Sequence, residues 1–293
     1  MIYSMENEFL KVEVNDSGAE LWNIFDKKNG GIPRLWQGEK AWNERSPLLF
    51  PYIGCLKDGK FIEEGVVYEG APHGFAKTMT HCLVSQEADR LVFSLTSKED
   101  TLKQYPWPFE LRTEYRIEGS QVYWVAQVKN TGDKKMPFGI GIHTGYMCPF
   151  EDGYKPDDYV IRFEKKENAV HLRHNDNGNL TGEEIPFLTD SDVLTLDNPQ
   201  FPNSFMLGNV KSDYIQIEEI PTGRYSRVYL KGAPVVAFWA QPGIAGYVCI
   251  QPWYSAPDAA DSDNSLFSKR AVQIAKPGET KEYVQVIELG NLS

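Results

Sequence analysis

The chain has 293 residues, and the 41% that are hydrophobic can supply a sizeable core. Its 30 basic and 41 acidic residues give a net charge of −11, which argues against nucleic acid or an anionic membrane as a partner. An uncharged small ligand stays possible.

Cysteine usage and the N-terminus bear on the compartment. The four cysteines lie far apart and form no Cys-x-x-Cys pair, which fits a reducing compartment and no metal or redox motif. The N-terminus is acidic where a signal peptide is basic, and the most apolar run, residues 234–240, is too short to span a bilayer. We therefore expect a soluble, cytoplasmic protein without a cofactor.

Apolar and polar residues alternate with a period of two along most of the chain, which predicts strands. In chain order these strands cover residues 10–14, 91–95, 111–117, 122–128, 159–163, 235–239, 247–250 and 283–289. Short helical turns are expected only at residues 39–43 and 98–104, and residues 171–190 are expected to form an exposed excursion. Many strands with so little helix predict a large antiparallel β-sandwich, as one domain over residues 1–293.

Two histidines lie in glycine-rich surroundings. His143 stands in Gly141-Ile-His-Thr-Gly145, and His73 stands between a proline and a glycine. Glycine allows close approach of a ligand, and histidine exchanges protons near neutral pH, so both are candidate acids or bases. The alternatives are a hydrogen-bonded core histidine at His143 and a solvated turn histidine at His73.

A series of short stretches carries a specific resemblance. In order they are Leu35-Trp-Gln-Gly, Ser46-Pro-Leu-Leu-Phe-Pro, His73-Gly-Phe-Ala, Lys129-Asn-Thr-Gly-Asp-Lys, Gly141-Ile-His-Thr-Gly, Cys249-Ile-Gln-Pro-Trp-Tyr and Lys276-Pro-Gly-Glu. This set resembles the aldose 1-epimerase (galactose mutarotase) family, and most of all its bacterial branch associated with lactose operons. The similarity runs from near residue 10 to near residue 288. The resemblance implies a galactose mutarotase-like supersandwich that binds a hexose.

The resemblance also implies a reaction, in which the sugar ring opens and recloses on the other face of C1. His143 matches the general acid of the family, and His73 matches the histidine that holds the sugar. This chain departs from the family at the remaining site positions: Gln251 replaces the basic glutamate, Cys55 an arginine, Asn203 an aspartate, Lys77 an arginine and Thr144 a proline. Further candidate sugar contacts are Trp253, Tyr146 and Asp258.

Three hypotheses follow. The first is an isomerase of the mutarotase type with an atypical site, in which Asp258 or His73 supplies the base. The second is a non-catalytic carbohydrate-binding or sensor protein, because glutamine cannot accept a proton at neutral pH. The third is an enzyme acting on a different sugar. A monomer or a homodimer is expected in each case.

Overall fold

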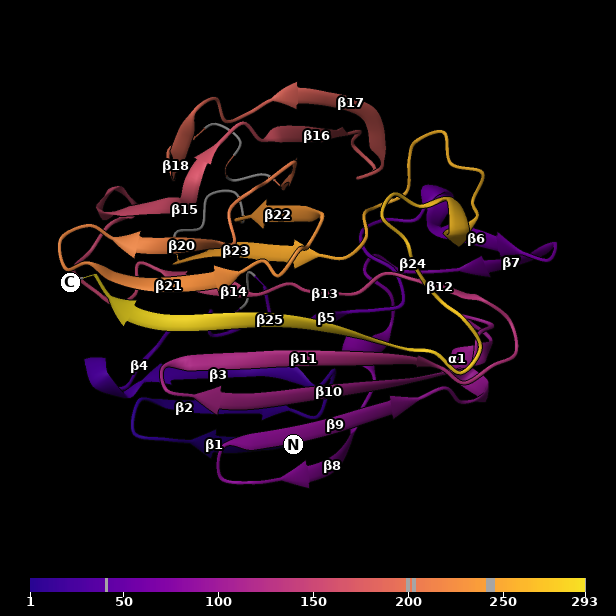
Figure 1. Ribbon diagram of the computed structural model, residues 1–293, viewed down its shortest axis with the longest axis horizontal. Helices are drawn as coiled ribbons and strands as arrows, with labels where there is room; N and C mark the ends of the chain where they lie inside the picture. Colours follow the sequence, from indigo (N-terminus) through magenta and orange to yellow (C-terminus); the bar gives the residue numbers. More distant parts are fainter. Residues whose placement is uncertain (40–41, 199–200, 202–203, 241–245, 293) are drawn as a thin grey trace.

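The computed structural model describes residues 1–39, 42–198, 201, 204–240 and 246–292, and antiparallel β-sheets dominate it (Figure 1). The largest sheet has nine strands, in the spatial order β18 (Ser191–Thr195), β15 (Tyr159–Glu167), β20 (Tyr214–Glu219), β21 (Arg224–Tyr229), β25 (Thr280–Asn291), β11 (Gln121–Asn130), β10 (Phe109–Glu118), β9 (Arg90–Thr96) and β8 (Cys82–Gln86). The second has eight strands, β17 (Leu180–Pro186), β16 (Val170–His174), β19 (Phe205–Gly208), β22 (Val235–Trp239), β23 (Gly246–Trp253), β13 (Gly141–Ile142) and β5 (Leu48–Leu49), with β14 (Gly145–Cys148) paired to β23. The all-β prediction is confirmed.

Smaller sheets and short helices complete the described chain. A four-stranded sheet contains β1 (Ile2–Glu6), β2 (Leu10–Asn15), β3 (Glu20–Asp26) and β4 (Ile32–Pro33), and two strand pairs join β6 (Lys60–Glu63) to β7 (Val66–Glu69) and β12 (Met136–Phe138) to β24 (Gln273–Ala275). Short 3-10 helices cover Lys27–Asn29, Lys57–Gly59, Ala76–Thr78, Pro156–Asp158 and Leu266–Ser268.

The helix predictions are confirmed in part. The predicted turn at residues 98–104 is α1 (Glu99–Leu102), the one α-helix in the described ranges. The predicted turn at 39–43 lies partly outside the described residues, and its described members are not helical. Within the part of the chain that the structure describes, no helix is long and apolar enough to cross a membrane.

The expectation of an exposed excursion over residues 171–190 is correct for the at least partial exposure of most side chains and wrong for the backbone, which belongs to a sheet. β16 and β17 form an antiparallel hairpin at the edge of the eight-stranded sheet, and β16 pairs with β19 (Figure 1). The polar sequence concealed the hairpin because β17 is an edge strand. Such a strand pairs through its backbone on one side while most of its side chains stay in solvent.

The main core lies between the two large sheets. Leu111 on β10 and Trp124 on β11 share one buried cluster with Phe238 on β22 and Ile250 on β23. Cys249, the neighbour of Ile250, belongs to a separate aromatic cluster, because successive side chains of a strand point to opposite faces. The eight-stranded sheet therefore has one face in the main core and a second face available for a site.

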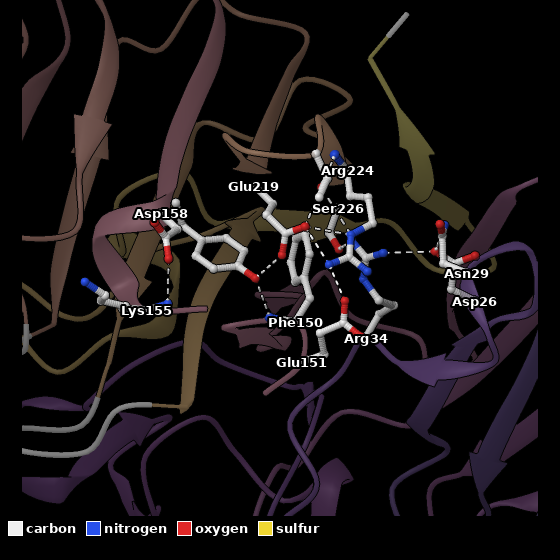
Figure 2. Close-up of polar contacts among 12 residues, drawn as sticks. Asp26, Asn29, Arg34, Phe150, Glu151, Lys155, Asp158, Glu219, Arg224 and Ser226 are labelled. Atoms are coloured by element: carbon white, nitrogen blue, oxygen red, sulfur yellow. Dashed lines mark hydrogen bonds and ion pairs between the residues drawn. The ribbon is translucent and has the colours of Figure 1, made fainter. Parts of the chain in front are cut away.

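A buried polar network ties the N-terminal sheet to the nine-stranded sheet (Figure 2). The fully buried Arg34 side chain donates hydrogen bonds to the Asp26 carboxylate at 2.9 Å and to the Ser226 hydroxyl at 3.1 Å. Its guanidinium stacks on the Phe150 ring, 3.7 Å from the centroid. Burial lowers the pKa of Arg34 to about 10, and the nearby Asp26 carboxylate opposes that effect.

The backbone of Arg34 and the residues after it runs beside β14. Met147 donates its N–H to the Arg34 carbonyl at 3.0 Å, and Trp36 donates to the Gly145 carbonyl at 2.9 Å. The anchored Arg34 therefore fixes this segment next to the strand that follows His143.

Asp26→Asn tests this anchor. The change keeps the size of the side chain but removes the charge that compensates the buried guanidinium, and we expect the free energy of unfolding to fall by about 3 kcal/mol. Urea unfolding followed by tryptophan fluorescence measures it. The matched control is Glu64→Gln, which breaks the exposed pair with Lys134 and should change the free energy of unfolding far less, because water screens that pair. Equal effects of the two changes would contradict the anchoring role.

Candidate active site

The stretch around His143 runs beside β23 within the eight-stranded sheet. Gly141 pairs with Trp253, and Gly145 pairs with Cys249, so His143 stands at the register of Gln251 on β23. A side chain at Gly141 would meet the Trp253 ring at 3.0 Å, and one at Gly145 would meet the Trp42 ring at 2.6 Å. The two glycines thus make room for an indole ring on either side of the histidine.

His73 reaches the same place from a strained turn. Its φ is +68°, and its backbone lies beside Gly54. The Gly54 N–H donates to His73 Nδ1 at 3.2 Å, so the proton of the neutral ring is on Nε2, which is left to meet a ligand. The His73 ring is perpendicular to the His143 ring, with 5.6 Å between centroids, and 5.7 Å from the Trp253 ring. The structure thus brings the two candidate histidines together.

A pocket of about 290 Å³ opens at the two histidines. Its wall is part aromatic, part charged and part apolar, and consists of Trp42, Glu44, Pro47, Leu49, His73, Lys77, His143, Ser204 and Trp239. The volume is close to the lower end of the range for small-molecule sites, about 300–1,000 Å³.

Burial sets the protonation of both histidines. It lowers the pKa of His143 to about 4, against a small opposing effect of the Glu44 carboxylate. It also lowers the pKa of His73 well below the ordinary value, with further lowering by His143 and Lys77. Both rings are therefore neutral at pH 7. His143 Nδ1 is buried without a hydrogen-bond partner in the protein, so it has an unused polar atom in the site.

Glu44 and Lys77 form an ion pair at the pocket wall. Lys77 Nζ lies 2.9 Å from Glu44 Oε1, and the Trp42 indole N–H donates to Glu44 Oε2 at 3.2 Å. Lys77 was predicted as a ligand contact. Glu44 and Trp42 were missed, because their stretch has no periodic pattern and no motif.

Aromatic rings surround His143 on two sides. The Trp42 ring is 5.1 Å and the Trp239 ring 5.6 Å from the His143 ring, centroid to centroid. The two indoles meet edge to face at 5.2 Å. Trp239 was also missed as a site residue. It ends a predicted strand, and only the pairing with Cys249 places it on the site face.

Gln251 faces the site side of β23, as the alternation predicts. It is buried, and its Oε1 has no hydrogen-bond partner in the protein. Trp253, on the same face, is also buried and its indole N–H is likewise unpartnered. Neither belongs to the pocket wall.

Asp258 and Cys55 lie away from the pocket wall, contrary to the expectation that they contact the ligand. The Asp258 carboxylate forms a buried ion pair with Lys269 at 2.6 Å and accepts the Lys57 N–H at 2.9 Å. Its own N–H donates to the Cys55 carbonyl at 3.0 Å, so Asp258 fixes the loop that contains Cys55. The Asp258 side chain is only 2% exposed, so it has no access to a ligand in the pocket.

The position of Tyr146 also differs from the prediction. It pairs with Val248 and packs in the main core, on the opposite face of the sheet from Trp253. Asn203 lies outside the described residues. The Thr144 hydroxyl is 2.6 Å from the Ser46 hydroxyl, in a buried contact next to His143. No cluster of side chains that could hold a metal ion occurs in the described ranges.

Comparison with known proteins agrees with the motif series. The model of the aldose 1-epimerase family matches residues 1–287. The plasmid-encoded Protein LacX of Lactococcus lactis subsp. lactis is 28% identical over 292 residues, which cover 96% of this chain and 97% of that protein.

Solved structures agree with the fold. A galactose mutarotase related enzyme from Lactobacillus acidophilus has a TM-score of 0.93 at 26% identity, covering 99% of this chain and 98% of that one. A galactose mutarotase-like protein from Lactobacillus casei ATCC 334 has a TM-score of 0.90 at 21% identity, covering 99% and 100%. Because the family model matches almost the entire length, this chain belongs to the aldose 1-epimerase family.

Proposed function

We propose that the protein binds a free hexose in the pocket at His143 and interconverts its α and β anomers by opening and reclosing the ring. The observation that carries the proposal is the pair of half-buried, neutral histidines at one small pocket, with ring centroids 5.6 Å apart. Membership of the aldose 1-epimerase family supports a sugar as the ligand.

The composition of the pocket wall supports an uncharged polyol. The Trp42 and Trp239 rings offer apolar faces for the C–H groups of a sugar. His73, Lys77 and Glu44 offer hydrogen-bond donors and acceptors for its hydroxyls. The Lys77 charge is already balanced by Glu44, which leaves no spare positive charge for an anionic group there.

Ring opening and ring closure each need one group that donates a proton to the sugar and one group that accepts a proton from it. In ring opening, an acid protonates the ring oxygen as the C1–O5 bond breaks, and a base removes the proton of the C1 hydroxyl. We assign the acid to His143 in its imidazolium form, with His73 holding the sugar. After rotation about C1, the same groups return the protons as the ring closes on the other face.

A non-catalytic sugar-binding protein is the second candidate, and Gln251 favours it. Its amide occupies the register of His143, where a carboxylate would give a second proton-transfer group. Glutamine can bind a hydroxyl but cannot take its proton.

His143→Gln separates the two candidates. We expect it to lower the rate of anomer exchange of galactose and glucose by about 10²–10⁴-fold, because one member of an acid–base pair is lost. Polarimetry or NMR exchange spectroscopy measures the rate. A wild-type protein that binds sugar without accelerating exchange, and gains activity in Gln251→Glu, would instead support the binding protein.

The pH dependence of the rate tests the role of His143. With the pKa of His143 lowered to about 4 by burial, the imidazolium becomes rarer as the pH rises. We therefore expect kcat/KM to fall between pH 5.5 and pH 7.5. A rate that rises over this interval would assign the neutral ring as a base.

The pH dependence of stability tests the buried state of His143. The pKa of His143 is about 4 in the folded protein and 6.5 in the unfolded chain. Between pH 6.5 and pH 4 the unfolded chain therefore binds a proton that the folded protein does not bind. The free energy of unfolding falls as the pH is lowered through this range. For this group the loss from pH 7.5 to pH 5 is about 2 kcal/mol. Urea unfolding should show that His143→Gln removes this part of the acid sensitivity. The part due to His73 and to His81, a second histidine whose pKa burial also lowers, should stay. An unchanged acid sensitivity would contradict the burial of a neutral ring.

A further inference from the structure

We propose that Glu44 is the general base of this pocket, the group that takes the proton from the C1 hydroxyl. The inference rests on the proposed function and deepens it. It places the catalytic carboxylate on the loop before β5 instead of on β23, where Gln251 stands.

Glu44 is the only carboxylate among the described residues of the pocket wall. Asp258 is held by Lys269 and by the Lys57 N–H, and Gln251 is not a proton acceptor. Glu44 lines the same pocket of about 290 Å³ as His143 and His73. The buried Nδ1 of His143, without a partner in the protein, is a second sign that the site is built to meet a polar ligand.

The Glu44 carboxylate retains capacity to accept a sugar hydroxyl. Lys77 contacts one of its oxygens and the Trp42 indole N–H contacts the other. An ionised carboxylate has about four acceptor positions, so two of them stay open. The side chain is 30% exposed, which gives a ligand access that the fully packed Asp258 lacks.

The loop that carries Glu44 is fixed on both sides. After it, the N–H groups of Arg45 and Ser46 donate to the Glu20 carboxylate at 2.6 and 2.9 Å. Before it, the Trp42 carbonyl accepts the indole N–H of Trp36 at 2.7 Å. Backbone anchors of this kind hold a loop residue in place before the substrate arrives.

Lys77 connects the base to the histidines. It lies in the 3-10 helix Ala76–Thr78, directly after the turn that holds His73. The ion pair therefore joins the loop of Glu44 to the segment of His73 across the pocket. The Lys77 charge also balances the negative charge on Glu44 between substrate turnovers.

The proton transfers balance. Glu44 takes the C1 hydroxyl proton, and the electron pair of that O–H bond becomes the second bond of the C1 carbonyl. The C1–O5 bond breaks, and its electron pair on O5 takes a proton from the His143 imidazolium. When the ring closes on the other face of C1, O5 gives its proton back to His143 and Glu44 gives its proton back to the C1 oxygen.

Glu44→Gln is the decisive variant, since it keeps shape and hydrogen bonding but cannot take a proton. We expect anomer exchange of galactose and glucose to slow by about 10²–10⁴-fold. Binding of the same sugars by calorimetry should stay within about threefold, because the loss falls on the transition state. Glu64→Gln, in the exposed pair with Lys134, is the matched control and should leave both quantities unchanged.

A second variant distinguishes the loss of the base from a folding defect. Glu44→Gln combined with Gln251→Glu returns a carboxylate to the site at the register of His143, and we expect part of the lost rate to return. Activity of Glu44→Gln equal to that of the wild type would overturn the assignment of the base alone. Loss of sugar binding together with activity would make Glu44 a binding residue and also overturn it. An inactive wild type would overturn the proposed function itself.

Discussion

The buried Arg34 guanidinium is the contact on which the geometry of the site depends. A charge without access to water needs a counter-charge and hydrogen bonds, and Asp26 and Ser226 supply them. Arg34 can therefore occupy only one place, between the N-terminal sheet and the nine-stranded sheet (Figure 2). Its backbone then pairs with β14, and β14 pairs with β23. This chain of pairings sets the register that places His143 beside Gln251.

The chemistry of the pocket combines neutral rings with one ion pair. Burial keeps His73 and His143 uncharged, so neither histidine needs a fixed counter-ion. The side chains of Glu44 and Lys77 are 30% and 21% exposed, so water lowers the cost of keeping their charges. In this arrangement a loop supplies the Glu44 carboxylate and the Trp42 ring, while the eight-stranded sheet supplies His143 and the Trp239 ring.

Several features of the site could be predicted from single stretches. The Gly141–Gly145 stretch indicated a close approach, and the structure places an indole against each of these two glycines. Other features could not. The loop that places Trp42 and Glu44 in the pocket is held by the Trp36 indole N–H on the Trp42 carbonyl and by the Arg45 N–H on the Glu20 carboxylate, and neither contact leaves a pattern in the sequence. The commitment of Asp258 to a buried ion pair likewise depends on a separate loop.

The sequence by itself determined the long alternating strands, the two faces of each of them and the family. It did so because side-chain direction reverses at every residue of a strand, and because an ordered series of motifs is a property of the chain alone. Only the tertiary structure decided which face of the eight-stranded sheet bears the site, that Tyr146 faces the core, and that Glu44 lies in the pocket. These outcomes depend on strand register and on loop anchors between distant residues, and neither leaves a periodic trace in the sequence.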